Sequence, residues 1–281
     1  MMPKAAASAK YSSIEAALDY LVPMRQKPHS LAYEPPPGVP RSNAGYEART
    51  VTLYDLRAST DVTSLDREGF ELIRHHSAVR DFHDEDELRR IYYPEAERLI
   101  AAATGGSRVI IFDHTMRRRI PGVADRTRGA PRQPVSSVHN DYTTNSGPRR
   151  LSGMQTEGER PAPQSRFSIV NLWRPVHGPL RDMPLAVCDA RTVAAGDLVA
   201  ADLVYPDRIG ENYLVTYNPG HRWFYVSEMN VDEAWLFRCY DSATDGRARF
   251  TPHAAFTHPA TTADTPPRES IELRSLVFYD T

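Results

Sequence analysis

The chain has 281 residues and a nearly balanced charge, with 34 basic residues, 36 acidic residues and a net charge of −2. This balance gives no overall attraction to nucleic acids or anionic membranes. No apolar run reaches the roughly 18 residues that a membrane-spanning helix needs. Only three of the basic residues are lysines, all within the first 27 positions, so lysine Schiff-base chemistry in the core is not expected. We therefore expect a cytoplasmic globular protein that binds neither nucleic acid nor membrane.

The N-terminal region is expected to lie outside the main core. Residues 1–10 are typical of a disordered tail, and residues 11–25 place four apolar side chains on one face of a predicted helix. Residues 33–41, with the sequence YEPPPGVPR, cannot form regular structure and predict an extended arm. Such an arm either wraps around its own domain or reaches across a partner subunit, which allows a homodimer.

A helix and the first strand of a β-core are predicted next. Residues 84–103 have an acidic first turn that complements a helix dipole, and Gly105 follows the last turn. Residues 108–114, with the sequence RVIIFDH, then read as a strand. The two cysteines, Cys188 and Cys239, stand apart in strand-like runs, which favours two buried thiols over a disulfide.

His139 and Asp141 are the first candidate metal ligands. In a β-strand, residues i and i+2 project to the same side, so these two side chains converge while Asn140 turns away. Residues 116–134, rich in Arg, Gly and Pro, lead into this pair, and a second loose stretch at 145–164 follows it. We expect both segments to act as mobile lids over a substrate. Their arginines either contact a carboxylated or phosphorylated substrate or are simply solvated.

After residue 165 the sequence changes to short strands separated by Gly and Pro. The predicted strands cover residues 167–174, 185–193, 198–204, 213–217, 222–227, 234–241, 249–255 and 271–279. This pattern, with helices confined to the first 105 residues, predicts a mainly β protein, namely a double-stranded β-helix (jelly roll, cupin-like) with an N-terminal helical layer. We expect a single domain over residues 1–281, with the tail, helix and arm in 1–45, the helical layer in 46–107 and the β-core in 108–281.

His253 completes a candidate set of two histidines and one carboxylate with His139 and Asp141. Three ligands on one face of an octahedral ion leave three positions open, as non-haem Fe(II) oxygenases require. His258 is the alternative to His253. We prefer His253 because it continues an apolar strand, whereas His258 precedes a loop rich in Pro and Thr.

The final strand carries a candidate site for a cosubstrate. A dicarboxylic cosubstrate that chelates iron through its keto-acid end needs a cation for its far carboxylate. Arg268, with the hydroxyl of Ser270 beside it, would supply one. Arg274 shares the strand face of Arg268 and is the replacement anchor, unless it forms a salt bridge with Glu272 instead.

Candidate substrate contacts come from aromatic and polar residues near the ligands or on the later strands. Aromatic residues at strand spacing are mostly core residues, so each candidate also has a purely structural interpretation. The candidates are Tyr142, Trp173, Arg174, Tyr217 and His221.

These motifs resemble those of the Fe(II)/2-oxoglutarate-dependent dioxygenases. Five segments are similar to one branch of that family, the hydroxylase/desaturases named for aspergillic-acid and gibberellin-desaturase-like proteins: NLWRP (171–175), YNPGHRWFY (217–225), YDS (240–242), PHAAF (252–256) and PRESIE (267–272). The resemblance covers residues 45–281. It implies the reaction class far better than the substrate.

The resemblance implies that His139, Asp141 and His253 hold Fe(II), and that Arg268 and Ser270 bind 2-oxoglutarate. It further implies an oxygenase that consumes O2, releases succinate and CO2, and uses a ferryl intermediate to hydroxylate, desaturate or cyclise a small specialised metabolite. Two other functions fit the same predicted barrel. A cupin-type metal hydrolase or isomerase gives the Arg-x-Ser motif no role, and a non-catalytic jelly-roll binding protein leaves the order of the ligand types unexplained.

Overall fold

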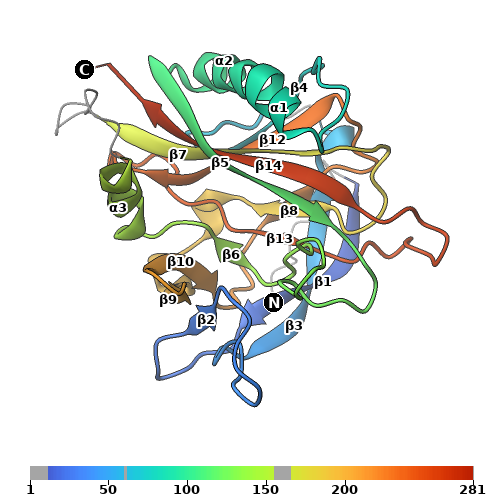
Figure 1. Ribbon diagram of the computed structural model, residues 1–281, viewed down its shortest axis with the longest axis vertical. Coiled ribbons are helices and arrows are strands. Elements are labelled where there is room, and N and C mark those ends of the chain that lie inside the picture. The colour runs from blue at the N-terminus through green and yellow to red at the C-terminus, as the bar shows by residue number, and fades with distance from the viewer. Residues whose placement is uncertain (1–11, 60–61, 155–165, 281) are drawn as a thin grey trace, which may run out of the picture.

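The computed structural model describes residues 12–59, 62–154 and 166–280, and places two β-sheets face to face (Figure 1). The nine-stranded sheet contains, in spatial order, β1 (Ser13–Leu21), β3 (Tyr46–Asp55), β11 (Trp223–Tyr225), β8 (Leu185–Cys188), β13 (His253–Ala255), β6 (His139–Asn140), β10 (Ile209–Val215), β9 (Leu198–Val204) and β2 (His29–Leu31). The five-stranded sheet contains β4 (Phe70–Arg74), β12 (Glu233–Asp241), β7 (Phe167–Pro175), β14 (Glu269–Phe278) and β5 (Arg108–Arg118). Two facing, mainly antiparallel sheets make a jelly roll, so the predicted fold class is confirmed.

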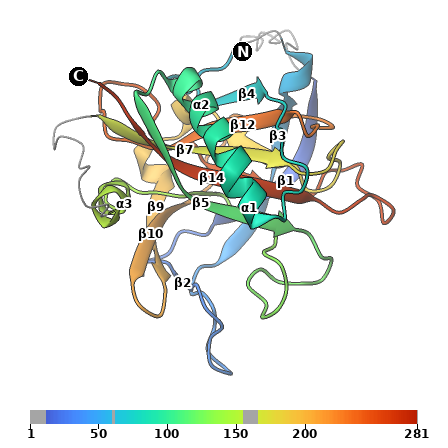
Figure 2. The same ribbon diagram turned by 45° about the horizontal axis from the view of Figure 1, so that its top comes forward.

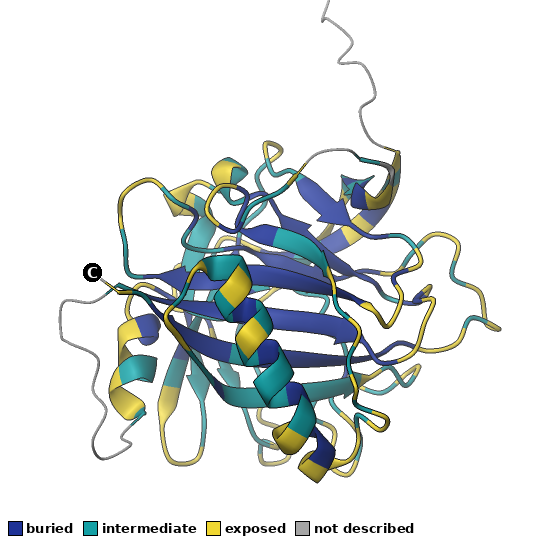
Figure 3. Cartoon of the chain, turned by 90° about the horizontal axis from the view of Figure 1, so that it is seen from above, coloured by how far each residue is buried: buried dark blue, intermediate teal, exposed yellow. Residues whose placement is uncertain are grey.

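One helical segment covers the outer face of the five-stranded sheet (Figures 2 and 3). It consists of α1 (Glu85–Glu87), η2 (Leu88–Tyr92) and α2 (Tyr93–Thr104). The Asp84 carboxylate caps its start by accepting two backbone N–H groups of the first turn, and Gly105 ends it at a φ of 68°. The helix predicted at 84–103 is confirmed. No helix in the described part of the chain is both long and apolar enough to cross a membrane.

The apolar stripe of this helix explains why it packs on the sheet. Leu88, Tyr92, Ala96 and Ile100 recur every four residues and are buried. Their partners on β7 and β14 are Val170, Leu172, Ile271 and Leu273. Burying one such large apolar side chain contributes roughly 1.5–3 kcal/mol, so this layer fixes the outer face of β7 and β14.

The opposite faces of the same strands point into the space between the two sheets. Phe167, Ile169 and Trp173 alternate with the helix-facing residues along β7, and Trp235 and Phe237 do the same on β12. All nine residues of β7 are buried, because the helix covers one face and the other sheet covers the second. Polar side chains that share this inner face are therefore held in an enclosed interior.

The nine-stranded sheet curls around a separate core of its own. Single bridges join β1 to the segments beside β6 and β10, at Asp19 with Ser137 and at Leu21 with Thr216. The core inside the curl holds side chains from β1, β8, β11 and β13, including Tyr20, Cys188, Trp223 and Ala254. The protein thus has an inner space between the sheets and a second core behind β6 and β13.

The N-terminal helix predicted at 11–25 is wrong, because residues 13–21 form β1, which pairs with β3 in antiparallel register. The apolar residues of this segment fit a helical period and a strand period about equally well, and pairing with β3 selects the strand. The predicted tail at 1–10 lies outside the described residues. Residues 46–107 are also not purely a helical layer, because β3 and β4 belong to the sheets.

Helices are not confined to the first 105 residues, because α3 (Ser146–Gly153) follows Asp141 closely. Further one-turn helices are η1 (Leu56–Ala58), η3 (Ala190–Thr192) and η4 (Ala195–Asp197). The loose stretch predicted at 145–164 is therefore wrong for its first half, and its second half, from residue 155, lies outside the described residues. The arginine-rich stretch at 116–134 begins inside β5, and its remainder is held by a bidentate ion pair of Arg132 with Asp125.

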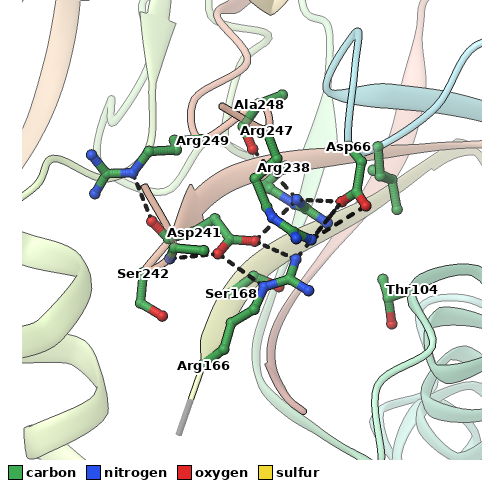
Figure 4. A network of polar contacts seen from close by, with 12 residues as sticks. Asp66, Thr104, Arg166, Ser168, Arg238, Asp241, Ser242, Arg247, Ala248 and Arg249 are labelled. Atoms are coloured by element: carbon green, nitrogen blue, oxygen red, sulfur yellow. Dashed lines mark hydrogen bonds and ion pairs between the residues drawn. The ribbon is translucent and has the colours of Figure 1, made fainter. Parts of the chain in front are cut away.

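A buried network of arginines and aspartates joins the ends of β7 and β12 (Figure 4). The Asp241 side chain is fully buried and accepts from Arg166 at 2.7 Å and from Arg238 at 3.0 Å. Arg238 is 1 % exposed and also pairs with Asp66 at 2.8 Å. One carboxylate thus neutralises the buried guanidinium of Arg238 and the partly exposed guanidinium of Arg166.

Replacing Asp241 with asparagine should destabilise the fold strongly, because the buried guanidinium of Arg238 and the partly buried guanidinium of Arg166 lose the anion that they share. Breaking a buried pair in this way costs about 3–5 kcal/mol. The measurement is the free energy of unfolding in urea. Asp245 offers a matched control, since it pairs with Arg247 at 2.7 Å while half exposed, and Asp245→Asn should cost much less because water screens an exposed ion pair. Equal losses in the two variants would contradict the prediction.

Candidate metal centre

The fold brings His139, Asp141 and His253 together at the inner face of the nine-stranded sheet. β6 and β13 are antiparallel neighbours, and His139 and His253 are direct partners in their register. The two imidazole rings lie 4.4 Å apart between centroids. One ligand atom from each of the three residues lies within 4.8 Å of the other two, which is close enough for a single metal ion. His258, the alternative ligand, is not part of this cluster of described residues.

Hydrogen bonds to the backbone orient both imidazoles. Nδ1 of His139 lies 2.7 Å from the carbonyl oxygen of Ser137, and Nδ1 of His253 lies 3.0 Å from that of Thr251. A carbonyl only accepts, so each Nδ1 must carry the proton and donate it. Each Nε2 then carries a free electron pair, and in both histidines it is the atom available for a metal.

The carboxylate of Asp141 is held by two donors on the opposite sheet. Its Oδ2 accepts from Nδ2 of Asn171 at 2.8 Å and from Nε of Arg274 at 3.1 Å. Its Oδ1 lies 3.8 Å from Nε2 of His139. One oxygen is thus fixed by the protein, and the other faces the imidazoles.

The protonation states of the three side chains match metal binding. Burial and the neighbouring His253 lower the pKa of His139 to about 4. Burial also lowers the pKa of His253. Burial by itself would raise the pKa of Asp141, but Arg274 and the two histidines hold it below its ordinary value. Two neutral imidazoles and one carboxylate at neutral pH form the donor set that suits Fe(II), so the residues present fit this ion.

Arg274 is surrounded by carboxylates rather than by an open space. Besides Asp141, its guanidinium contacts Asp113 at 2.9 Å and Glu272 at 3.0 Å. The sequence left open whether Arg274 anchors a cosubstrate or pairs with Glu272, and the structure has the ion pair. Three acidic partners leave Arg274 little capacity for a further anion, so it acts as a support for Asp141.

Arg268 is different, because it is 2 % exposed and has no carboxylate at ion-pair distance among the described residues. Its Nε donates to Oγ of Ser270 at 3.1 Å, and its Nη1 donates to the carbonyl of Met183 at 2.8 Å. The guanidinium carbon lies 4.8 Å from the ring centroid of Trp173. Burial and the repulsion of Arg117 lower the pKa of Arg268 to about 9. This cation is therefore short of a counter-charge.

Arg117 is a further inner-face cation that the sequence analysis assigned only to a loop. It lies directly opposite Ser270 in the pairing of β5 with β14, and its Nη1 donates to the carbonyl of Gln133 at 2.7 Å. Burial and Arg132 lower its pKa to about 10. The alternation of Asp113, Thr115 and Arg117 along β5 was the signal in the sequence that would have placed these three side chains on one face of a strand.

Of the predicted substrate contacts, Trp173 and Tyr142 belong to the core between the sheets, on the side of the metal ligands. Arg174 does not. It is fully buried on the helix-facing side of β7, where its Nη2 contacts Nδ1 of His75 at 2.9 Å and its guanidinium lies over Tyr92. Successive strand residues point to opposite faces, so Trp173 and Arg174 cannot both line the inner space.

Tyr217 and His221 also lie away from the metal centre. Both contact Tyr20 in the core behind the nine-stranded sheet, and the His221 side chain is 1 % exposed. Nε2 of His221 lies 3.1 Å from Asp197, and Nδ1 lies 3.2 Å from the hydroxyl of Tyr20. These contacts place both residues in the packing of the second core, and substrate binding by them stays a prediction.

His75 allows a test of this assignment of Arg174. Burial and the adjacent Arg174 lower the pKa of His75 below its ordinary value of 6.5. The folded protein therefore resists a proton that the unfolded chain accepts as the pH falls below 6.5, and stability should decrease in that direction. His75→Asn keeps an acceptor near Arg174 but cannot titrate. Urea unfolding at pH 7.5, 6.5 and 5.5 should show a smaller acid loss in the variant, by less than about 1 kcal/mol. Identical pH dependence in both proteins would refute this.

Comparison with known proteins is consistent with this site. A profile described as an oxidoreductase/YMDC permease-like domain matches residues 18–278. The hydroxylase/desaturase efuI of Hormonema carpetanum is 34 % identical over 84 % of this chain and 85 % of its own length. The alpha-ketoglutarate-dependent dioxygenase phiK of a fungal species is 33 % identical over 96 % of this chain and 98 % of its own.

A similar structure is also known. The iron and alpha-ketoglutarate-dependent endoperoxidase NvfI superposes with a TM-score of 0.85 at 26 % identity, covering 96 % of this chain and 99 % of the other. In sequence, the Fe(II)/2-oxoglutarate-dependent dioxygenase nvfI of Aspergillus novofumigatus is 30 % identical over 87 % of this chain and 88 % of its own length. The chain therefore belongs to the family of Fe(II)/2-oxoglutarate-dependent dioxygenases that includes these fungal hydroxylase/desaturases.

Proposed function

We propose that this protein is an oxidoreductase that uses Fe(II), 2-oxoglutarate and O2 to hydroxylate, desaturate or cyclise a small specialised metabolite, with release of succinate and CO2. The observation that carries the proposal is the cluster of His139, Asp141 and His253, in which hydrogen bonds fix both Nδ1 atoms and leave both Nε2 atoms free. Family membership supports the same reaction class.

The three clustered side chains would hold the iron. When bound, Fe(II) supplies activation of O2 and oxidation of an unactivated C–H bond. The chain's own contribution is to keep the ligands in place. Asn171 and Arg274 fix one oxygen of Asp141, and Asp113 and Glu272 in turn fix Arg274. Because these donors and acceptors come from β5, β7 and β14, the five-stranded sheet orients a ligand that belongs to the other sheet.

Buried cations on the inner face would form the 2-oxoglutarate pocket. Arg268 and Ser270 would bind the far carboxylate by charge-assisted hydrogen bonds, and Trp173 would keep the guanidinium in place by stacking. Arg117, opposite Ser270, adds a second positive charge on the same face. A dianion entering here would supply the counter-charge that Arg268 lacks, and it would add to the single carboxylate, that of Asp125, which lies 3.9 Å from Nη1 of Arg117.

The inner core around these groups keeps water away from the reaction. Trp173, Trp235 and Phe237 are at most 1 % exposed, and the Phe237 ring lies 4.6 Å from the His253 ring between centroids. An apolar wall strengthens the ion pairs around the ligands and limits side reactions with solvent.

We propose a small molecule as the substrate, no nucleic-acid or membrane partner, and a location in the cytoplasm. A homodimer is also proposed from the proline-rich arm. In the structure this arm makes contacts within its own chain, where Nη1 of Arg41 donates to the carbonyl of Tyr33 at 2.7 Å. Sedimentation of the purified protein would decide whether it pairs with a second copy.

The proposed function is tested by anaerobic addition of Fe(II) and then 2-oxoglutarate. We expect a weak visible charge-transfer absorption band that needs both additions, and formation of succinate when O2 is admitted. A protein that binds the metal but shows no band and forms no succinate would favour a cupin-type hydrolase or a binding protein instead.

A further inference from the structure

The helix α3 forms one wall of the inner space. Its residues Gly147, Arg150 and Leu151 recur at helical spacing and share one face, and Met154 follows directly after the last turn. Leu151 and Met154 pack against the core between the sheets. A side chain at position 147 would start 2.6 Å from the ring of Tyr240, so the helix touches this ring directly. The shared face of α3 is thus turned toward the metal side of the protein.

The start of α3 is fixed to the metal ligand Asp141. The hydroxyl of Thr143 accepts from the backbone N–H of Ser146 at 3.0 Å, and the hydroxyl of Ser146 accepts from the backbone N–H of Thr143 at 2.8 Å. Thr143 also donates to the buried carboxylate of Glu211 at 2.5 Å. Because Thr143 is only two residues from Asp141, α3 cannot shift far without moving that ligand.

Arg150 is a partly buried cation on this face. Its guanidinium carbon lies 4.0 Å from the ring centroid of Phe112 on β5. Its Nε is buried and has no hydrogen-bond partner, and no carboxylate among the described residues lies at ion-pair distance from it. A buried donor without an acceptor costs about 1–3 kcal/mol. This cost would be relieved by a ligand that brings its own acceptor.

Tyr142 directly follows Asp141 in the chain. Its ring packs against the core between the sheets, as Phe112 and Leu151 do. Its hydroxyl makes no hydrogen bond to any of the described residues. Because the guanidinium of Arg150 lies over the ring of Phe112, this guanidinium and Tyr142 belong to the same region of the inner space.

We propose that Arg150 and Tyr142 form an oxyanion subsite for the substrate, with Phe112, Leu151 and Met154 as its apolar walls. The substrate class is a largely apolar molecule that carries a carboxylate or enolate oxygen. This inference rests on the proposed function, since it concerns the substrate of the same metal centre. It is separate from the 2-oxoglutarate pocket, which uses Arg268 and Ser270.

The test uses 1-naphthaleneacetate as an apolar oxyanion probe and 1-naphthaleneacetamide as its neutral counterpart. Binding is followed by naphthyl fluorescence under anaerobic conditions, with Fe(II) and saturating 2-oxoglutarate so that the cosubstrate pocket is filled. The wild-type protein should bind the carboxylate at least about ten-fold more tightly than the amide, as expected for a charge-assisted hydrogen bond. Equal affinity for the two probes would overturn the proposal.

Two variants and one matched control show which residues cause the preference for the carboxylate over the amide. Arg150→Gln should remove the preference for the carboxylate without weakening the amide. Arg149→Gln, at an exposed position on the same helix, should change neither affinity. Tyr142→Phe removes only a hydroxyl and should weaken carboxylate binding several-fold, which keeps the test informative if Arg150→Gln does not fold. A preference that survives in both Arg150→Gln and Tyr142→Phe would overturn the subsite. The charge-transfer band of the wild-type protein tests the proposed function independently of this result.

Discussion

Replacing Asp141 with asparagine is expected to lower Fe(II) affinity by at least about 100-fold and to abolish succinate formation. Asparagine has the shape of aspartate, but its two terminal atoms are no longer equivalent. Asn171 and Arg274 both donate to the Oδ2 position, so the amide would turn its oxygen toward them and its NH2 group toward the imidazoles. An NH2 group has no electron pair available for a metal.

The measurement is an anaerobic titration with Fe(II), repeated with Mn(II) to avoid oxidation. Asp113→Asn is a suitable control, because Asp113 contacts the same Arg274 but is not a member of the ligand cluster. That variant should bind Fe(II) within several-fold of the wild type. Wild-type affinity in Asp141→Asn would remove Asp141 from the ligand set.

The two candidate histidines can be separated in the same assay. His253→Ala should lose metal binding, whereas His258→Ala should retain it, because His258 packs near Tyr225 and Phe256 outside the ligand cluster. The reverse result would show that His258, and not the His253 chosen from the sequence, is the metal ligand.

Local sequence patterns predicted the elements that are stabilised locally. Residues 84–103 form a helix because a cap, an acidic first turn and an apolar stripe all favour the same structure. Residues 198–204 form β9 with the predicted bounds. The helix prediction for residues 13–21 failed because their apolar residues suit a helical period and a strand period equally well. Pairing with β3, a strand distant in sequence, decides for the strand.

The residues around the metal centre were harder to predict than its ligands. His139, Asp141 and His253 all carry side chains that can bind a metal, which made them recognisable in the sequence. The fold brings one ligand atom of each within 4.8 Å of the other two. In the sequence, Asn171 looks like an ordinary polar strand residue, and Arg117 belongs to an arginine-rich stretch that was expected to be a loop. Their roles depend on which sheet faces which, and strand alternation defines two faces without telling which one is the inner face.

The position of two predicted substrate contacts, away from the metal centre, has the same origin. This fold has two apolar interiors on either side of β6 and β13. Tyr217 and His221 are aromatic and close in sequence to buried strands, so they suit either interior. Only the curl of the nine-stranded sheet, closed by the bridges of Asp19 and Leu21, assigns them to the second core.

Replacing Arg268 with methionine is expected to weaken 2-oxoglutarate binding by roughly 30-fold or more, which corresponds to the 2–5 kcal/mol typical of a desolvated, hydrogen-bonded charge pair. Methionine keeps much of the apolar volume beside Trp173 but removes the cation. Fe(II) affinity should stay near the wild-type value, because Arg268 contacts none of the ligands. Ser270→Ala should weaken binding less, since it removes one hydroxyl.

Arg274→Met distinguishes the two candidate anchors. Arg274 contacts Asp141 and two further carboxylates, so this variant leaves three acidic side chains without their cation and should weaken Fe(II) binding first. Dissociation constants for both Fe(II) and 2-oxoglutarate, followed by tryptophan fluorescence and by the visible band, separate the two effects. The opposite result would be that Arg268→Met binds 2-oxoglutarate as tightly as the wild type, whereas Arg274→Met binds Fe(II) normally and no longer binds 2-oxoglutarate. In that case Arg274 is the anchor, and the lack of a carboxylate partner for Arg268 needs another explanation.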